Sequence, residues 1–198
     1  MKRIGMTGLL LAVFLPVLSA QTIAPPAVVK SAVVSVEALG KKVVNSDYKA
    51  AIDSMYPQWK DRMAKRKGGL KKLEEELEGI GEMMARNGVQ IISFKTVGAP
   101  KSYEVWPGDN TNAAAGKINY TKWLLLIPTV TQFRIFHDDS PKGAVINSHG
   151  FQVAIADKGK NNWTFINGSD VSVSDLRSLF ITLPANMELP TVKREEAD

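Results

Sequence analysis

Two side chains of this sequence could carry protons inside a folded cavity, His149 and Asp53. A histidine titrates near neutral pH, and a carboxylate whose pKa is shifted by a partner can act as a general acid or base. His149 shares its strand parity with Phe151 and Val153, which predicts that it lies among core residues. Asp53 directly follows Ile52 on a predicted helix. We favour a buried, neutral and structural His149, and His149 with Asp53 as proton carriers is the alternative.

Other catalytic signatures are missing from the sequence. The 198 residues include no cysteine and only two histidines, which excludes disulfides, thiolate catalysis and a three-histidine metal site within one chain. His137, Asp138 and Asp139 lie at a predicted hairpin turn, where turn chemistry accounts for them without a metal. No nucleophile elbow, Walker phosphate loop or dinucleotide glycine motif is present. We therefore predict no catalytic residue set, no metal and no cofactor.

The charge of the chain gives no sign of a nucleic-acid partner. The sequence has 25 basic and 20 acidic residues and a formal net charge of +5, which is small for a nucleic-acid-binding domain. A basic stretch from Lys60 to Lys72 is followed at once by acidic residues from Glu74 to Glu82. We interpret this stretch as a solvated helical surface and not as a phosphate- or membrane-binding patch.

The first twenty residues have the pattern of an export signal. Lys2 and Arg3 precede an apolar run that ends in Leu18-Ser19-Ala20. That run is about 14 residues long, short of the roughly 20 that a membrane-spanning helix needs. We predict a signal peptide over 1–20 that is cleaved before Gln21, with no membrane span afterwards. The absence of cysteine favours the periplasm or the exterior of a bacterial cell.

The rest of the chain divides into helices followed by strands. Apolar residues at steps of three and four predict helices over 28–44, over 48–63 with an interruption at Pro57, and over 70–87. After Gly88, β-branched and aromatic residues predict strands over 89–97, 103–106, 120–136, 144–156 and 163–166. Pro128 predicts a bulge or bend, and a bulge at Gly150 would turn His149 outward. A short helix over 173–180 follows.

This order predicts a single α+β domain over 28–190. The N-terminal helices should pack on one face of a strongly curved antiparallel sheet, between a flexible leader over 21–27 and a disordered tail over 191–198. Aromatic side chains and one histidine should gather between the helices and the sheet, where an apolar cavity could hold a ligand. The predicted ligand-binding residues are Tyr56, Trp59, Trp123, Phe133, His149 and Phe151.

Several segments resemble the nuclear transport factor 2-like superfamily, also described as cystatin-like cones. They are Asn45–Ala51, Met55-Tyr56-Pro57, Gly68-Gly69, the strand meander and Asn162–Ile166. The ending Leu179–Pro184 looks like that of exported bacterial members. The resemblance covers roughly residues 28 to 190 and implies helices packed into a strongly bent sheet. The superfamily includes isomerases, dehydratases and epoxide hydrolases that use Asp and His, and also non-catalytic binding domains; no enzyme motif matches residue by residue.

The sequence therefore favours an exported, non-catalytic binding domain. Its partner would be a small apolar ligand, a peptide or another protein, and a second copy of the chain is one further candidate. The alternative is a small cofactor-independent lyase or isomerase that uses His149 and Asp53. A structure in which His149 and Asp53 both face one open cavity would favour the alternative.

Overall fold

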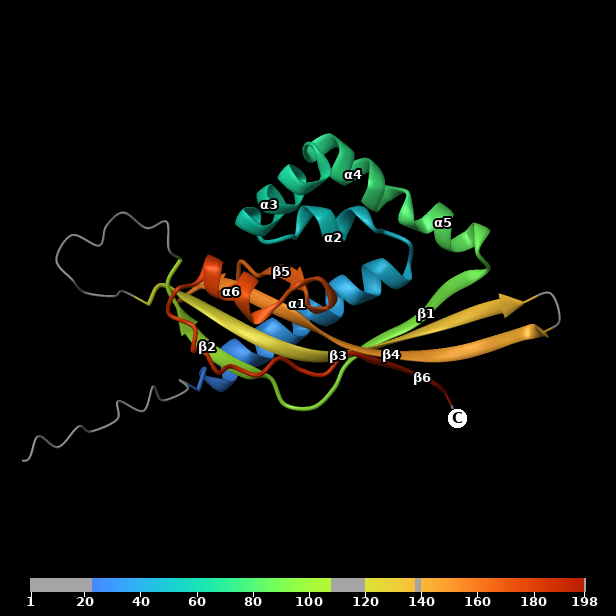
Figure 1. Ribbon diagram of the computed structural model, residues 1–198. Helices are drawn as coiled ribbons and strands as arrows, with labels where there is room; N and C mark the ends of the chain where they lie inside the picture. The colour runs from blue at the N-terminus through green and yellow to red at the C-terminus, as the bar shows by residue number, and fades with distance from the viewer. Residues whose placement is uncertain (1–22, 108–119, 138–139, 198) are drawn as a thin grey trace, which may run out of the picture.

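The computed structural model describes residues 23–107, 120–137 and 140–197. Helices come first and most strands follow (Figure 1). The helices are α1 (Pro26–Val44), α2 (Lys49–Asp53), α3 (Pro57–Lys67), α4 (Leu70–Glu78), α5 (Ile80–Arg86) and α6 (Val173–Leu179), with a 3-10 turn η1 (Gly168–Asp170). The strands are β1 (Val89–Thr96), β2 (Lys101–Val105), β3 (Lys122–His137), β4 (Ser140–Asp157), β5 (Thr164–Asn167) and β6 (Lys193–Glu196). This is the α+β architecture that the sequence predicts.

One antiparallel sheet is built on β3 and β4, which pair along almost their whole lengths. β1 pairs with the second half of β3 and β2 with the first half, so β1 and β2 share one edge of the sheet. β5 and β6 share the other edge, beside β4. We call the part that contains residues 122–128 and 151–157 the covered half, and the part that contains residues 129–137 and 140–150 the distal half.

A bulge or a bend was predicted at Pro128, and the structure has no bulge there. The pairing of Pro128 with Phe151 on β4 is in register, and the register shifts of the sheet lie elsewhere, in β1 and near the end of β3. The Pro128 carbonyl accepts a hydrogen bond from the Val97 N–H at 2.9 Å, so it points away from β4, towards the chain between the end of β1 and the start of β2. The backbone nitrogen of a strand residue points to the same side as its carbonyl, so the proline lacks an N–H on that side only. The proline therefore removes no hydrogen bond from the β3–β4 pairing.

Both faces of the covered half are buried, which corrects the prediction of helices on one face only. α1 covers one face, where the buried residues are Ala24, Ala32, Val36, Trp123, Leu125, Ile127, Ala154, Ala156, Trp163 and Phe165. α6 and the chain after it cover the opposite face, where the buried residues include Leu124, Leu126, Val153, Ile155, Leu176, Leu179 and Phe180. The cause is the uninterrupted apolar run Trp123–Ile127, which presents large apolar side chains to both faces.

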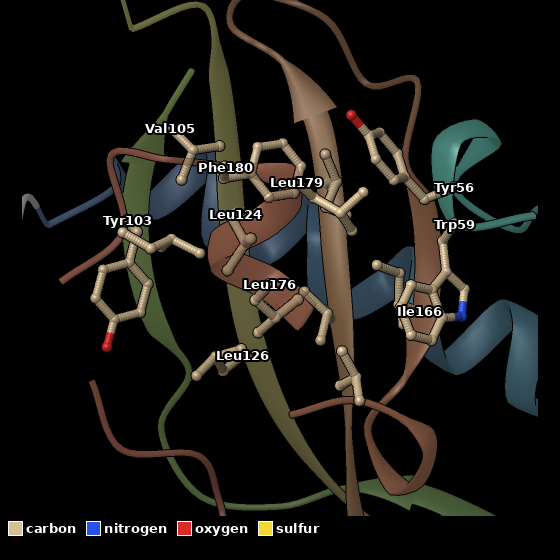
Figure 2. Close-up of a cluster of buried hydrophobic side chains, with 14 of the residues drawn as sticks. Tyr56, Trp59, Tyr103, Val105, Leu124, Leu126, Ile166, Leu176, Leu179 and Phe180 are labelled. Carbon is tan, nitrogen blue, oxygen red and sulfur yellow. The ribbon is translucent and has the colours of Figure 1, made fainter. Parts of the chain in front are cut away.

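Figure 2 shows the core on the α6 side, where side chains distant in the sequence meet. Trp59 of α3 is 2% exposed, as its place on the helical stripe predicts. Tyr56, just before α3, packs against Phe180 with ring centroids 5.4 Å apart. The backbone N–H of Tyr56 donates to the Phe165 carbonyl at 2.9 Å. This hydrogen bond fixes the start of α3 beside β5 and so brings Tyr56 to the core.

Pro57 restarts the helix as predicted, because α2 ends at Asp53 and α3 begins at Pro57. The helix predicted over 70–87 is instead broken at Gly79 into α4 and α5. Glycine costs roughly 1 kcal/mol more than alanine in a helix interior, and Gly79 and Gly81 lie two residues apart, so the break falls where the helix propensity of that segment is lowest.

The described parts of two segments that were predicted to be flexible are packed or paired instead. In the leader expected over 21–27, Ala24 is 2% exposed and its N–H donates to the Ser102 hydroxyl, and α1 already begins at Pro26. In the tail expected to be disordered over 191–198, Lys193–Glu196 forms β6. That strand pairs with the free edge of β4, whose backbone groups otherwise lack partners. The side chains of Lys193–Glu196 are all charged and exposed, so the amino-acid composition of this strand is like that of a disordered tail.

Candidate functional site

An apolar cleft of about 380 Å³ lies on the α1 side of the sheet, next to the covered half. Its floor is formed by strand residues that include Ile91, Phe94 and Phe133. Its walls come from the end of α1, from α2 and the chain on either side of it, and from α4 and α5. Figure 1 shows how α4 and α5 pass along one side of the sheet towards β1. We refer to this site as the apolar cleft.

The length of α1 explains why the cleft opens where it does. The first part of the helix buries Ala32 and Val36 against the covered half. Leu39 still packs against that core and also lines the cleft, and the last part of the helix carries Val43 further along the cleft, where it is half-buried. The chain just before β5 holds the helix in place, because the indole N–H of Trp163 donates to the Ser31 hydroxyl at 2.9 Å.

A glycine allows α1 to approach the sheet closely at the cleft. Gly40 is buried, and a Cβ at this position would overlap the ring of Phe94 on β1. The Phe94 ring therefore occupies the space that a side chain on α1 would fill, and both residues line the cleft. Gly40, which from sequence weakens the helix, is required here for packing.

The helical wall opposite α1 is loosely packed. α5 has no buried residue, and α4 buries only Leu73. Leu77, Ile80 and Met84 line the cleft and are half-buried. Side chains that are apolar yet incompletely covered mark a surface on which an apolar ligand would find unfilled contact area.

Most polar side chains that line the cleft lie on the sheet side, and Tyr48, just before α2, is a polar residue of the helical side. Those on the sheet side are Thr131 on β3, Gln152 on β4, Asn167 at the end of β5 and Asp170 in η1. Among the described residues that line the cleft, Tyr48 and Asp170 are the ones with titratable side chains. The site thus combines a largely apolar surface with a few polar groups, which is the usual composition of a small-molecule pocket.

Of the six predicted ligand-binding residues, the structure places Phe133 in the apolar cleft. Trp123 is buried in the core beneath α1. Tyr56, Trp59 and Phe151 lie in the core on the α6 side of the sheet (Figure 2). The prediction placed all of these aromatic residues between helices and one sheet face. Alternation along the strands instead sends Trp123 and Phe133 to one face and Phe151 to the other, and α3 places Trp59 on the side of Phe151.

His149 is not among core residues, which corrects the prediction from parity. The face is the predicted one, because Gly150 pairs in register with Thr129 and no bulge intervenes. However, the cover ends at Phe151, and the His149 side chain is 28% exposed. Its Nε2 lies 2.7 Å from Glu195 Oε1 on β6. His149 therefore helps to hold the C-terminal strand against β4.

Asp53, the second proton-carrier candidate, is a surface residue. Its side chain is 57% exposed and lies 2.7 Å from Lys49 Nζ one helical turn earlier. The hydrogen bond from Lys49 lowers the pKa of the Asp53 carboxyl, so it favours the charged form. Neither Asp53 nor His149 lines the apolar cleft, and His149 belongs to the opposite sheet face. The structure does not bring the two residues together.

A second cavity of about 350 Å³ lies at the end of the covered half, with Tyr56 among its lining residues. Its charged groups are paired with each other. Asp157 accepts hydrogen bonds from Lys122 and Asn162, and these bonds lower its pKa from 3.8 to about 2. Groups already engaged in this way have a structural role, and we place the candidate site at the apolar cleft.

The wall residues Tyr48, Leu77, Ile80 and Met84 were missed from sequence. Their signal was present, because each continues an apolar stripe on a helix that is too short to bury it fully. The predicted turn at His137 to Asp139 lies partly outside the described residues. Within the described residues there is no group of three metal-ligating side chains.

Comparison of the chain with protein-family models, with curated proteins and with solved structures gave no match. Over the part of the chain that the structure describes, no helix combines the length and apolar character needed to cross a membrane. The function is therefore argued from the geometry of the apolar cleft.

Proposed function

We propose that this protein is a non-catalytic binding protein for a small apolar molecule, which it holds in the apolar cleft. The observation that carries the proposal is the cleft itself, about 380 Å³ in volume and lined mainly by aliphatic, aromatic and methionine side chains. Small-ligand pockets typically enclose about 300–1,000 Å³, so this volume suits a compact ligand better than a protein segment. Burial of apolar ligand surface would supply the binding energy.

The side chains of the cleft favour binding over catalysis. General acid–base chemistry needs a group that is aimed at the substrate and tuned by a partner. Of the described cleft residues, Asp170 is the one carboxylate, and it accepts a hydrogen bond from Asn167 at 3.2 Å and has no histidine beside it among them. The alternative lyase or isomerase finds no support in the positions of His149 and Asp53.

We propose in addition that the protein works outside the bacterial cytoplasm, in the periplasm or beyond. The support is the export pattern of residues 1–20, which lie outside the described part of the chain. Ile23 is 85% exposed, and Ala24 is the first described residue that is packed. Cleavage before Gln21 would therefore leave the described packing intact.

Two neighbouring methionines on α5 provide the test. Met84 lines the cleft, whereas Met83 is 56% exposed and does not. Binding of the apolar fluorophore N-phenyl-1-naphthylamine is measured by its rise in fluorescence. Met84→Lys should weaken binding by about tenfold or more, because a charged group in an apolar site costs at least 1–2 kcal/mol. Met83→Lys should bind like the wild type.

Equal binding to the wild type and to Met84→Lys would contradict the proposal. Equal melting temperatures of the two variants would show that the substitution acts on the cleft and not on the fold. Mass spectrometry of the protein purified from its native compartment would then identify the molecule that it carries.

A further inference from the structure

The apolar cleft has a polar corner at one end. Gln152 and Asn167 are paired in register across β4 and β5, so their side chains are neighbours on the cleft side of the sheet. Asn167 Nδ2 donates to Asp170 Oδ2 at 3.2 Å, which joins η1 to the same group. We call Gln152, Asn167 and Asp170 the polar corner. Asn167 and Asp170 are exposed, so the corner lies at the mouth of the cleft.

The opposite end of the cleft is apolar. Phe133 pairs with Ile146 on β4, six positions before Gln152 on the same strand. At about 3.3 Å for each residue, the two ends are roughly 20 Å apart along the sheet. Ile91 and Phe94 lie beside Phe133 on β1. The cleft is thus long, with an apolar end and a polar end, which matches a molecule with one hydrocarbon chain and one head group.

The charge of the polar corner determines which head group fits. Asp170 is the one charged side chain among the described residues that line the cleft, and a carboxylate only accepts hydrogen bonds. The Gln152 side-chain amide makes no hydrogen bond among the described residues, so its donor and acceptor are both free. A head group that donates hydrogen bonds and carries positive charge is therefore favoured, and a carboxylate or phosphate head group is repelled.

We infer that the apolar cleft binds a single-chain amphiphile whose head group is a protonated amine, held at Asp170 with its chain directed towards Phe133. The inference rests on the proposed function and adds to it the chemical class of the ligand. The preference should be moderate, since an exposed ion pair changes affinity by roughly two- to fivefold and is weakened by salt.

Three ligands with the same chain and different head groups test the inference. Dodecylamine, dodecanol and dodecanoate compete with N-phenyl-1-naphthylamine at neutral pH and low salt, below the concentrations at which they form micelles. The expected order of affinity is amine, alcohol and carboxylate, with each step roughly two- to fivefold. Asp170→Asn keeps an acceptor for Asn167 and should bring the amine and the alcohol to equal affinity.

Asp53→Asn is the matched control, because it removes the same charge from a carboxylate outside the cleft. It should preserve the order of the three ligands. An Asp170→Asn variant that retains the amine preference, or a wild type that prefers dodecanoate, would overturn the inference. After either of these two results the proposed function still stands, provided that dodecanol binds the wild type and binds Met84→Lys poorly. Failure of all three ligands to displace the fluorophore would overturn the inference, whereas the proposed function would fail only if fluorophore binding did not depend on Met84.

Discussion

At the residue scale, the charged side chains of this protein join elements to one another and leave the cleft almost uncharged. Arg62 and Arg66 of α3 both lie over the Trp59 ring, at 5.7 and 5.8 Å from its centroid. The same two guanidinium groups reach Asp175 of α6 at 3.7 and 3.4 Å. These contacts connect α3 to α6 over the core that Figure 2 shows. His149 and Glu195 do the same for β4 and β6.

Asp157 leads to a prediction on pH. Lys122 donates to its carboxylate and lowers its pKa from 3.8 to about 2 in the folded state. Because the unfolded chain has the higher pKa, this group stabilises the fold above about pH 4, and the stabilisation disappears as the pH falls to about 2. The loss should be about 1 kcal/mol after screening by solvent. Asp157→Asn should be less stable than the wild type at neutral pH and should lack this acid-dependent step.

Urea denaturation of the two proteins at neutral pH and near pH 2 measures the effect. Asp53→Asn serves as a comparison, because the Asp53–Lys49 pair lies on the surface and should contribute much less. The same acid-dependent loss in the wild type and in Asp157→Asn would show that Asp157 is not its source.

At the scale of elements, the cleft exists because α1 is longer than the core beneath it and because α4 and α5 are short. α1 spans 19 residues, whereas α4 and α5 span 9 and 7. A helix of that length buries few side chains, and α5 buries none. The turn between α3 and α4 uses Gly68 and Gly69, both at positive φ, which lets the chain reverse sharply. The helical wall therefore lies beside the sheet without sealing it.

The close contact between α1 and β1 at Gly40 predicts that replacing this helical glycine by alanine destabilises the protein. Alanine is favoured over glycine in a helix interior by roughly 1 kcal/mol. Gly40→Ala should nevertheless destabilise the protein by about 1–3 kcal/mol, because the new methyl group overlaps the Phe94 ring. It should also weaken fluorophore binding, since Phe94 lines the cleft.

The double variant Gly40→Ala with Phe94→Ala isolates that contact. Its free energy of unfolding should be higher than the sum of the two single effects predicts, because removal of the ring makes room for the methyl group. Additive effects, or a Gly40→Ala variant that is more stable than the wild type, would show that α1 can shift away from β1 at no cost.

At the scale of the whole molecule, the covered half of the sheet supplies stability and the polar corner, and the distal half supplies the apolar end of the cleft. The covered half is buried on both faces, by α1 and by α6. In the distal half, many strand residues are only half-buried, including His149 and Phe133. Rigid packing in one half can hold the strands in place while the other half keeps an open apolar surface for a ligand.

The proposed location outside the cytoplasm gives the prediction at this scale. The chain produced from its full sequence in a bacterial host should be recovered outside the cytoplasm with an N-terminus near Gln21. Intact-mass measurement and N-terminal sequencing of the exported protein check this directly. A protein that still begins at Met1 would contradict cleavage, and the apolar segment would then need another explanation.

The sequence by itself determined the local structure of most elements. The change of apolar period at Gly88, the proline at position 57 and the stripe that includes Trp59 predicted helices before strands and a buried Trp59. These features are set by neighbours along the chain, so they can be read without the fold. The resemblance to nuclear transport factor 2-like proteins stays a prediction.

The tertiary structure alone decided which surfaces are covered. Strand parity fixes the face on which His149 and Phe151 lie, yet only the position of α6 makes one half-exposed and the other buried. The pairing of β6 with β4, the split of the aromatic residues between two cores and the apolar cleft are also products of long-range contacts. Burial depends on which distant segment packs above a side chain, and the spacing of apolar residues along the chain does not show which segment that is.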